Sequence, residues 1–230
     1  IKFLLFAAAV LLIALAAAIA AEQAPGSTIV TDSVTSDQLA EFIEKKLGCR
    51  HHRFKRGYKN VINEAKRLNE AGETCLLAME TSGHGALKEN YFLDDGAYLA
   101  TKIVIRYAQL RRQGRTLADL LEGMREPLEA RELRFHLLPE DFKAAGAAVL
   151  AALAQYAAGQ PGWVPAPDNY EGLRYAVPAQ KGWFLLRMSL HDPLMPLNIE
   201  SDCPGGSSAI LRELTPFLTA QPALDTTVLD

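Results

Sequence analysis

The chain has 230 residues, of which 49% are hydrophobic and 22% are charged, as in ordinary globular proteins of one or two domains. Its formal net charge of −3 argues against a nucleic acid as the main partner, because proteins that bind polyanions usually carry a basic excess. The three cysteines, Cys49, Cys75 and Cys203, stand far apart and form no C-x-x-C pair, which is typical of a reducing compartment.

An apolar run from Phe3 to Ala21 dominates the start of the chain. It is long enough for a secretory signal peptide or a membrane anchor. The α/β pattern and the unpaired cysteines that follow instead favour a buried helix that remains from a preceding domain. We therefore expect residues 1–24 to form such a helix and no membrane to be a partner, with a signal peptide or an anchor as the alternative.

Strands and helices alternate between residues 25 and 125. β-branched or apolar residues predict strands at 27–31 and 74–79, and a basic strand and loop lies at 51–59. Apolar residues at helical spacing predict helices over 35–47, 61–68 and 94–110, with a short one at 116–124. This alternation predicts a mixed-sheet α/β/α domain over residues 25–125.

The pattern changes near Pro127, where a second domain, residues 126–230, is expected. Residues 129–137 partly alternate polar with apolar side chains, as a half-exposed antiparallel strand does. Further strands are predicted at 170–177, 183–189 and 195–200. Helices are predicted at 141–158 and 207–214, the second ended or kinked by Pro216. The fold class is therefore α/β, with an α+β domain following the mixed-sheet domain.

Ionisable residues and a glycine crowd the loop Glu80-Thr81-Ser82-Gly83-His84, directly after the apolar strand 74–79. Binding groups in open α/β sheets collect at the carboxyl ends of strands. The carboxylate of Glu80, the hydroxyl of Ser82 and the imidazole of His84 suit a polyhydroxylated ligand, because each can exchange hydrogen bonds with hydroxyl groups. A capped turn with solvated side chains is an alternative of similar weight.

Two other places offer cations. Arg187 and Ser189 are predicted to lie on one face of a strand, where they suit a phosphate; the alternative is an exposed arginine paired with Asp192. Lys59 stands where a loop meets a helix, although its spacing alone favours a solvated lysine. His191 by itself is typical of a surface histidine. No His or Cys pair has the spacing of a zinc site, so no metal ligands are predicted.

Four ordered motifs carry a resemblance to a known family. They are Pro25-Gly26-Ser27-Thr28-Ile29-Val30-Thr31-Asp32-Ser33, then Arg56-Gly57-Tyr58-Lys59, then Glu80-Thr81-Ser82-Gly83-His84 with Asp94-Asp95-Gly96, and Lys181-Gly182-Trp183 with Arg187-x-Ser189. The chain from Leu12 to Pro222 resembles the C-terminal half of the phosphoglucomutase/phosphomannomutase (α-D-phosphohexomutase) family, and a plant-type branch above all.

The resemblance implies a protein of four domains, of which this chain holds the third and a TBP-like fourth. The family's third domain binds sugar hydroxyls, here with Glu80, Ser82 and His84 and with a second loop at Tyr58 and Lys59. Its fourth domain binds phosphate, here with Arg187 and Ser189. The family pattern here is Arg-x-Ser-Asn-Thr-x-Pro, and Leu190 stands at the position of its Asn. Leucine has no side-chain amide to donate to a phosphate. His191 then supplies a substitute donor.

The family's serine loop and its aspartate-rich metal loop have no counterpart in these 230 residues. The resemblance therefore implies Mg²⁺ in the intact family enzyme, with no ligands for it in this chain. It also implies that the N-terminal part of the chain is truncated relative to the family or unrelated to it. We expect the C-terminal portion of a phosphohexomutase, which binds a hexose phosphate such as glucose 1-phosphate or glucose 6-phosphate. The alternative is a non-catalytic sugar-phosphate binding protein. We expect a cytoplasmic or plastid location rather than a secreted or membrane-anchored one; the sequence leaves the compartment, the sugar and the oligomeric state open.

Overall fold

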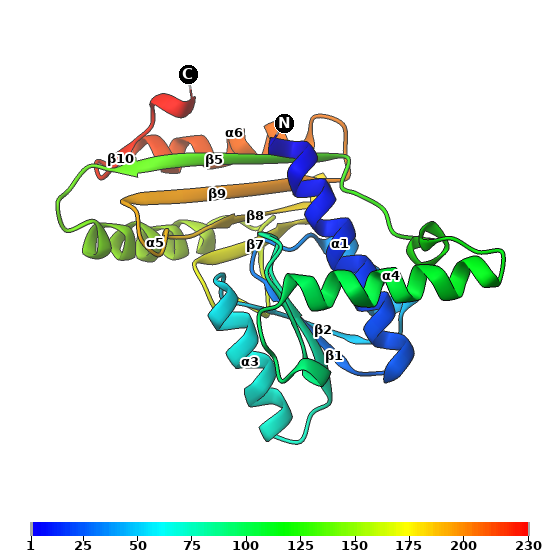
Figure 1. Ribbon diagram of the computed structural model, residues 1–230. Coiled ribbons are helices and arrows are strands. Elements are labelled where there is room, and N and C mark those ends of the chain that lie inside the picture. Colours follow the sequence, from blue (N-terminus) through cyan, green and yellow to red (C-terminus); the bar gives the residue numbers. More distant parts are fainter. Residues whose placement is uncertain (1, 230) are drawn as a thin grey trace. The chain divides into compact units, whose positions relative to one another are not determined.

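The computed structural model describes the backbone of residues 2–229 and the side chains of residues 9–229. The chain divides into two compact units, Ile1–Glu126 and Pro127–Asp230, called here the N-terminal and the C-terminal unit. Each unit has its own sheet, one mixed and one antiparallel (Figure 1). The predicted fold class is therefore confirmed.

The mixed sheet of the N-terminal unit has the strand order β2-β1-β3-β4. These strands are β1 (Thr28–Asp32), β2 (Arg50–Phe54), β3 (Cys75–Met79) and β4 (Gly85–Leu87). β1 runs parallel to both of its neighbours, whereas β4 returns antiparallel to β3. The chain reverses between β3 and β4 at Gly83, whose φ of +98° favours glycine. The sequence did not predict the three-residue strand β4.

Helices cover both faces of this sheet. They are α1 (Lys2–Gln23), α2 (Asp37–Glu41) with a π turn (Phe42–Lys46), α3 (Tyr58–Glu70) and α4 (Gly96–Arg112), besides 3-10 turns at Lys88–Asn90 and Leu117–Leu121. α1 and α4 pack with Ile29 and Leu77 of the strands, whereas α3 packs with Val30 and Ala78. Successive strand residues point to opposite faces, so this is an α/β/α sandwich (Figure 1).

Residues 13–21 of α1 are buried in this sandwich, and they are apolar on all sides of the helix. Ile13, Ala14 and Ala17 have no exposed surface. The described part of the chain contains no helix both long enough and apolar enough to cross a membrane. The alternative of a signal peptide or an anchor is based on the apolar run from Phe3 to Ala21. The side chains of residues 1–8, which include the start of this run, lie outside the described part.

The antiparallel sheet of the C-terminal unit has the order β10-β5-β9-β8-β7-β6. Its strands are β5 (Glu129–Leu137), β6 (Val164–Pro165), β7 (Leu173–Val177), β8 (Gly182–Leu186), β9 (Leu194–Ser201) and β10 (Leu224–Asp225). Its helices are α5 (Phe142–Ala158) and α6 (Gly206–Thr219), with 3-10 turns at Pro178–Gln180 and Thr227–Leu229. Both α5 and α6 pack on one face of the sheet, around Phe135, Phe184 and Leu197.

Two predicted ends in this unit are wrong. Of the two alternatives for Pro216, the end is wrong, because α6 continues to Thr219 with the proline inside it, and the kink stays a prediction. β8 stops at Leu186 rather than at residue 189. Arg187 donates its backbone N–H to Pro196 across the sheet, at 3.1 Å, but Pro196 has no N–H to return. β8 thus ends before both predicted residues, and Arg187 and Ser189 lie in the loop that follows it, where the Ser189 N–H still donates to the Leu194 carbonyl oxygen at 2.8 Å.

Candidate functional site

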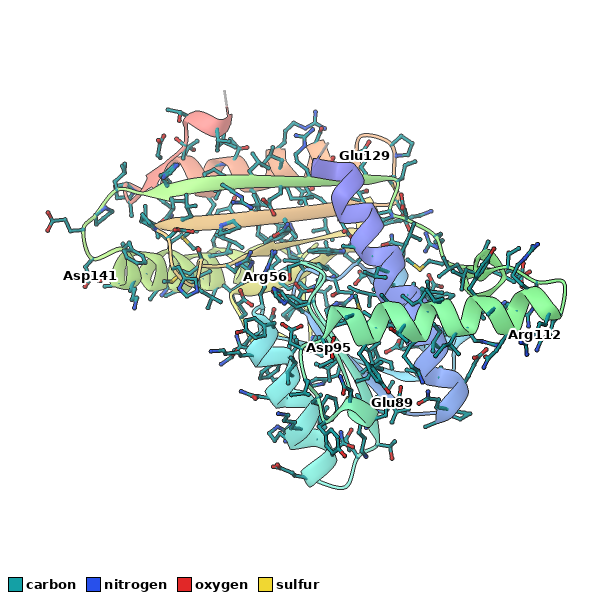
Figure 2. The ribbon with its side chains drawn as sticks, in the orientation of Figure 1. Arg56, Glu89, Asp95, Arg112, Glu129 and Asp141 are labelled. Atoms are coloured by element: carbon teal, nitrogen blue, oxygen red, sulfur yellow. The ribbon has the colours of Figure 1, made fainter. Side chains whose placement is uncertain are left out.

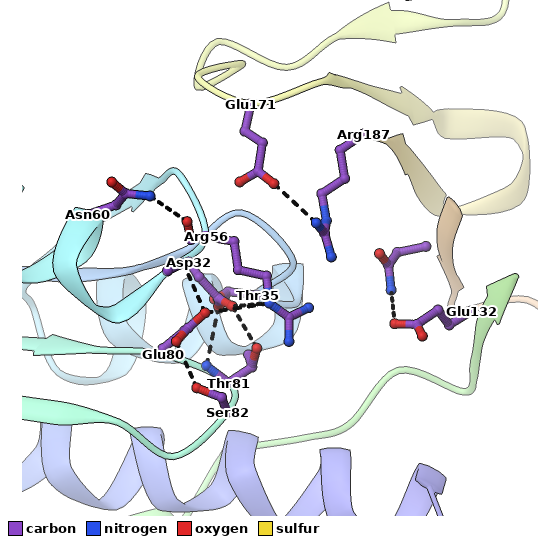
Figure 3. Close-up of polar contacts among 12 residues, drawn as sticks. Asp32, Thr35, Arg56, Asn60, Glu80, Thr81, Ser82, Glu132, Glu171 and Arg187 are labelled. Carbon is purple, nitrogen blue, oxygen red and sulfur yellow. Dashed lines mark hydrogen bonds and ion pairs between the residues drawn. The ribbon is translucent and has the colours of Figure 1, made fainter. Parts of the chain in front are cut away.

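Polar side chains of the N-terminal unit gather where its parallel strands end (Figure 3). Asp32 is the last residue of β1, and Glu80 follows β3 directly. Arg56 stands two residues after β2. Because the carboxyl ends of parallel strands meet at one edge of a sheet, three segments far apart in sequence supply one cluster.

Asp32 is the buried centre of this cluster, with no exposed surface. It accepts hydrogen bonds from the Thr81 hydroxyl, at 2.6 Å, and from the Thr35 hydroxyl, at 3.1 Å. Burial raises the pKa of the Asp32 carboxyl, while the bond from Thr81 and the charge of Arg56 act in the opposite direction. Asp32 thereby joins the loop after β1 to the loop after β3.

Glu80 is also buried, with 5% of its surface exposed. Its Oε1 accepts the backbone N–H of Gly57 at 3.0 Å, and its Oε2 accepts the Ser82 hydroxyl at 2.7 Å (Figure 3). Arg56 Nε lies 3.4 Å from Glu80 Oε1 and 3.9 Å from Asp32 Oδ2. Glu80 is therefore not a solvated turn residue. Gly57 and Arg56 both approach Oε1, whereas Oε2 has one donor and a second lone pair, so Oε2 can still accept a ligand hydroxyl.

His84 lies at the exposed side of the same loop, with about half of its side chain exposed. Its Nδ1 is 2.7 Å from Asp94 Oδ2, and its ring stacks on Tyr58 with 4.8 Å between ring centroids. A carboxylate can only accept, so Nδ1 carries the proton and Nε2 of the neutral ring is an acceptor. Two neighbours thus hold the imidazole in one orientation.

Tyr58 and Lys59 begin α3, and both are exposed. Lys59 Nζ lies 5.9 Å from the centre of the Tyr58 ring. The structure therefore brings Glu80, Ser82, His84 and Tyr58 into one group through direct contacts, and Lys59 joins it through Tyr58. This is the grouping that the N-terminal motifs predicted. That these residues bind a ligand stays a prediction.

In the C-terminal unit, Arg187 is buried, with 6% of its surface exposed. Its Nη1 lies 3.3 Å from Glu171 Oε1 (Figure 3). The alternative of an exposed arginine paired with Asp192 is therefore wrong. Ser189 accepts the backbone N–H of Asp192 at 3.3 Å. His191 is exposed on the same loop.

Two glycines allow this loop to lie where it does. Gly172, with φ of +62°, approaches so closely that a Cβ there would stand 2.3 Å from the Leu186 carbonyl oxygen. The close approach places Glu171 beside Arg187. Gly146 of α5 leaves room for Met188, whose sulfur would lie 2.7 Å from a Cβ at that position. Gly172 is required here, because a Cβ would meet backbone atoms, whereas at position 146 the flexible Met188 side chain would have to move.

Sequence reasoning did not single out four residues that hold the predicted ones in place: Asp32, Arg56, Asp94 and Glu171. The first three stand inside the motifs that carry the family resemblance, so a signal was present. Glu171 precedes Gly172 in a loop. Its ion pair with Arg187 depends on the close approach of Gly172 to Leu186, which the sequence does not reveal.

In the residues that the structure describes, no group of three or more His, Cys, Asp or Glu side chains could hold a metal ion. Asp32 and Glu80 are held by hydroxyl, amide and guanidinium donors instead. These residues do not fit the Mg²⁺ that the family resemblance implies for the intact enzyme.

Comparisons with known proteins agree on one family. Residues 9–127 match the phosphoglucomutase/phosphomannomutase α/β/α domain III. Over 179 residues the chain is 29% identical to a phosphomannomutase/phosphoglucomutase of Pseudomonas aeruginosa, covering 77% of this chain and 35% of that protein. The chain thus spans about a third of the length of this relative.

Solved structures support the fold. A phosphoglucomutase/phosphomannomutase family protein from Burkholderia thailandensis superposes with a TM-score of 0.69 at 22% identity, over 94% of this chain and 42% of that one. An N-acetylphosphoglucosamine mutase from Aspergillus fumigatus, in complex with GlcNAc-6P and magnesium, gives 0.57 at 14% identity, over 90% and 43%. These relatives are bacterial and fungal, so the likeness to a plant-type branch stays a prediction.

Proposed function

Because the chain belongs to the phosphoglucomutase/phosphomannomutase family, we propose that it supplies the substrate-binding part of a phosphohexomutase. Such an enzyme transfers a phosphoryl group within a hexose phosphate, for example between glucose 1-phosphate and glucose 6-phosphate. Residues 25–125 would bind the sugar hydroxyls, and residues 126–230 would bind a phosphate. The proposal depends on the motifs and on the geometry of each unit by itself.

The observation that carries the proposal is the buried, hydrogen-bonded carboxylate of Glu80 beside the oriented ring of His84. A carboxylate held by Gly57 and Ser82 loses little conformational freedom when a sugar hydroxyl donates to it. The Nε2 atom of His84 offers a second acceptor. Fixed acceptors of this kind orient a polyhydroxylated substrate, which lowers the entropic part of the activation barrier.

Arg187 supports the phosphate-binding part of the proposal. Glu171 and the close packing of Gly172 hold its guanidinium on a short loop that also carries Ser189 and His191. A guanidinium can donate two parallel hydrogen bonds to a phosphate, and a hydroxyl and an imidazole can add one each. The Mg²⁺ of the family enzyme would offset phosphate charge from residues outside this set.

Calorimetric titration of the full chain tests both halves of the proposal. Arg187→Lys should weaken glucose 1-phosphate and inorganic phosphate alike, by roughly tenfold or more, because lysine keeps the charge but lacks the planar fork. Ser82→Ala should weaken glucose 1-phosphate only. Arg134→Lys, which changes an exposed arginine of the same unit, is the matched control. Unchanged affinity in Arg187→Lys, or no heat with any hexose phosphate, would overturn the proposal.

A second candidate function is a protein that binds a hexose phosphate without transferring its phosphoryl group. The side chains that carry the first candidate, Glu80, His84 and Arg187, suit binding of a sugar phosphate in either case. The two candidates differ in turnover. Conversion of glucose 1-phosphate by the purified chain, with Mg²⁺ and glucose 1,6-bisphosphate supplied, would exclude the second candidate.

A further inference from the structure

Asn198 lies on the outer face of the C-terminal sheet, which is the face turned away from α5 and α6. Leu197, the residue before it in β9, is fully buried in the core beneath these helices. Because successive strand residues point to opposite faces, Asn198 points outward. Leu186 at the end of β8 is a core residue as well, and Arg187 follows it with its backbone N–H paired to Pro196 of β9. Arg187 therefore continues the alternation onto the outer face.

β5 places a carboxylate on the same face. It begins at Glu129 (Figure 2), whose side chain accepts the Ser207 hydroxyl of α6 at 2.6 Å and so lies on the helix side. Glu132, three residues further on, lies on the outer face, directly opposite Asn198 in the strand register. Asn198 is thus the cross-strand neighbour of Glu132 and the diagonal neighbour of Arg187, a separation that long side chains can span.

The side-chain amide of Asn198 has one end satisfied and one end not. Asn198 is 8% exposed, and its Nδ2 donates to Glu132 Oε2 at 3.3 Å. A carboxylate can only accept, so this bond decides which end of the amide is the donor. The Oδ1 atom at the other end is buried and has no hydrogen-bond partner among the residues that the structure describes. A buried acceptor without a donor costs free energy, so Oδ1 is a place for a donor from outside the chain.

The groups around Oδ1 select the donor that it can meet. Arg187, whose guanidinium is held by Glu171, is the proposed phosphate-binding group (Figure 3). Glu132 adds a second acceptor, with 33% of its side chain exposed. A phosphate offers mainly acceptor oxygens, which neither Asn198 Oδ1 nor the Glu132 carboxylate can bind. The donor is therefore a hydroxyl of the group to which the phosphate is attached.

We propose that Asn198 binds a hydroxyl of the sugar whose phosphate Arg187 binds. Glu132, which reaches solvent, turns aside as the hydroxyl enters and donates to Asn198 Oδ1. The C-terminal unit then recognises the sugar as well as the phosphate, and Asn198 distinguishes a hexose phosphate from inorganic phosphate. This inference rests on the proposed function, and it adds a sugar contact to the unit to which that function assigns the phosphate alone.

Calorimetric titration of the full chain tests the inference. Asn198→Leu keeps the size of the side chain and removes the acceptor. It should raise the Kd of glucose 1-phosphate roughly fivefold, as the loss of one hydrogen bond does, and leave the Kd of inorganic phosphate unchanged. Gln155→Leu, which removes an exposed amide of α5, is the matched control and should leave both constants unchanged. Thermal unfolding shows that both variants fold.

Monodeoxy analogues of glucose 1-phosphate identify the hydroxyl. One of them should bind the original chain and Asn198→Leu equally, because it lacks the donor that Asn198 accepts. The inference is overturned if no analogue does so, or if Asn198→Leu binds glucose 1-phosphate as the original chain does. An equal loss for glucose 1-phosphate and inorganic phosphate also overturns it, because this indicates a structural role.

Arg187→Lys separates a failure of this inference from a failure of the proposed function. If Arg187→Lys weakens both ligands and Asn198→Leu weakens neither, the sugar contact alone is wrong. If Arg187→Lys leaves inorganic phosphate binding unchanged, or if the original chain binds no hexose phosphate, the proposed function and the sugar contact are both wrong.

Discussion

At the carboxyl end of β1, the side chain of Asp32 is fully buried among hydroxyl groups and next to Arg56. Burial raises its pKa because the charged form loses solvation. The folded protein therefore binds this proton more tightly than the unfolded chain does. The resulting stabilisation is present below the ordinary pKa of 3.8 and is lost as the pH rises through the folded-state pKa.

Asp32→Asn should remove this pH dependence, because an amide stays uncharged. We expect the free energy of unfolding of the variant, relative to the original chain, to increase as the pH rises from 3.8 through the folded-state pKa of Asp32. Urea unfolding at several pH values measures it. Asp37→Asn, which changes an exposed carboxylate of α2, is the control. Parallel stability curves for Asp32→Asn and the original chain would contradict the expectation.

Sequence reasoning found the side chains that face a possible ligand but not those that hold them. Glu80, Ser82 and His84 were predicted because a buried strand precedes them, and strand ends gather binding groups. Their supports come from elsewhere: Gly57 binds Glu80, and Asp94 binds His84. Such pairings depend on how distant segments meet, so local residue patterns do not reveal them.

At the scale of elements, segments with a repeating apolar pattern were predicted, and strands of two or three residues were not. The helices α3, α4 and α5 follow from their apolar spacing. β4, β6 and β10 have only two or three residues and exist through pairing with a neighbouring strand, so they lack a pattern of their own. The predicted end of β8 was wrong for a related reason, because Pro196 on the facing strand has no N–H to donate to Arg187, and the residues of β8 itself do not show this.

Gly172, which directly precedes β7, offers a test of how the loop between β8 and β9, residues 187–193, is held in place. Gly172→Ala should destabilise the C-terminal unit by ~2 kcal/mol or more, because alanine is strained at φ of +62° and its Cβ would collide with the Leu186 carbonyl oxygen. Thermal unfolding measures the loss. Gly162→Ala is the matched control, since a Cβ there meets nothing within 4 Å. Equal melting temperatures for the two variants would show that the loop adapts freely.

At the scale of the whole chain, the predicted family is confirmed, and the two units have separate hydrophobic cores. One core lies entirely within residues 127–230, around Phe184. The N-terminal cores are built on β1 and β3, with Leu77 fully buried. Units with their own cores usually unfold as separate cooperative transitions. We therefore expect two transitions in calorimetry.

Replacing one buried side chain of each core by alanine assigns each unfolding transition to its unit. Phe184→Ala should cost ~3–5 kcal/mol in the C-terminal unit and Leu77→Ala ~2–5 kcal/mol in the N-terminal unit, because each leaves a cavity. Both tryptophans, Trp163 and Trp183, lie in the C-terminal unit, so their fluorescence follows that transition alone. Phe184→Ala should lower the fluorescence midpoint, whereas Leu77→Ala should shift only the other calorimetric peak. If Leu77→Ala moves the fluorescence midpoint as far as Phe184→Ala does, the two units unfold as one, because a cavity in one core then weakens the other.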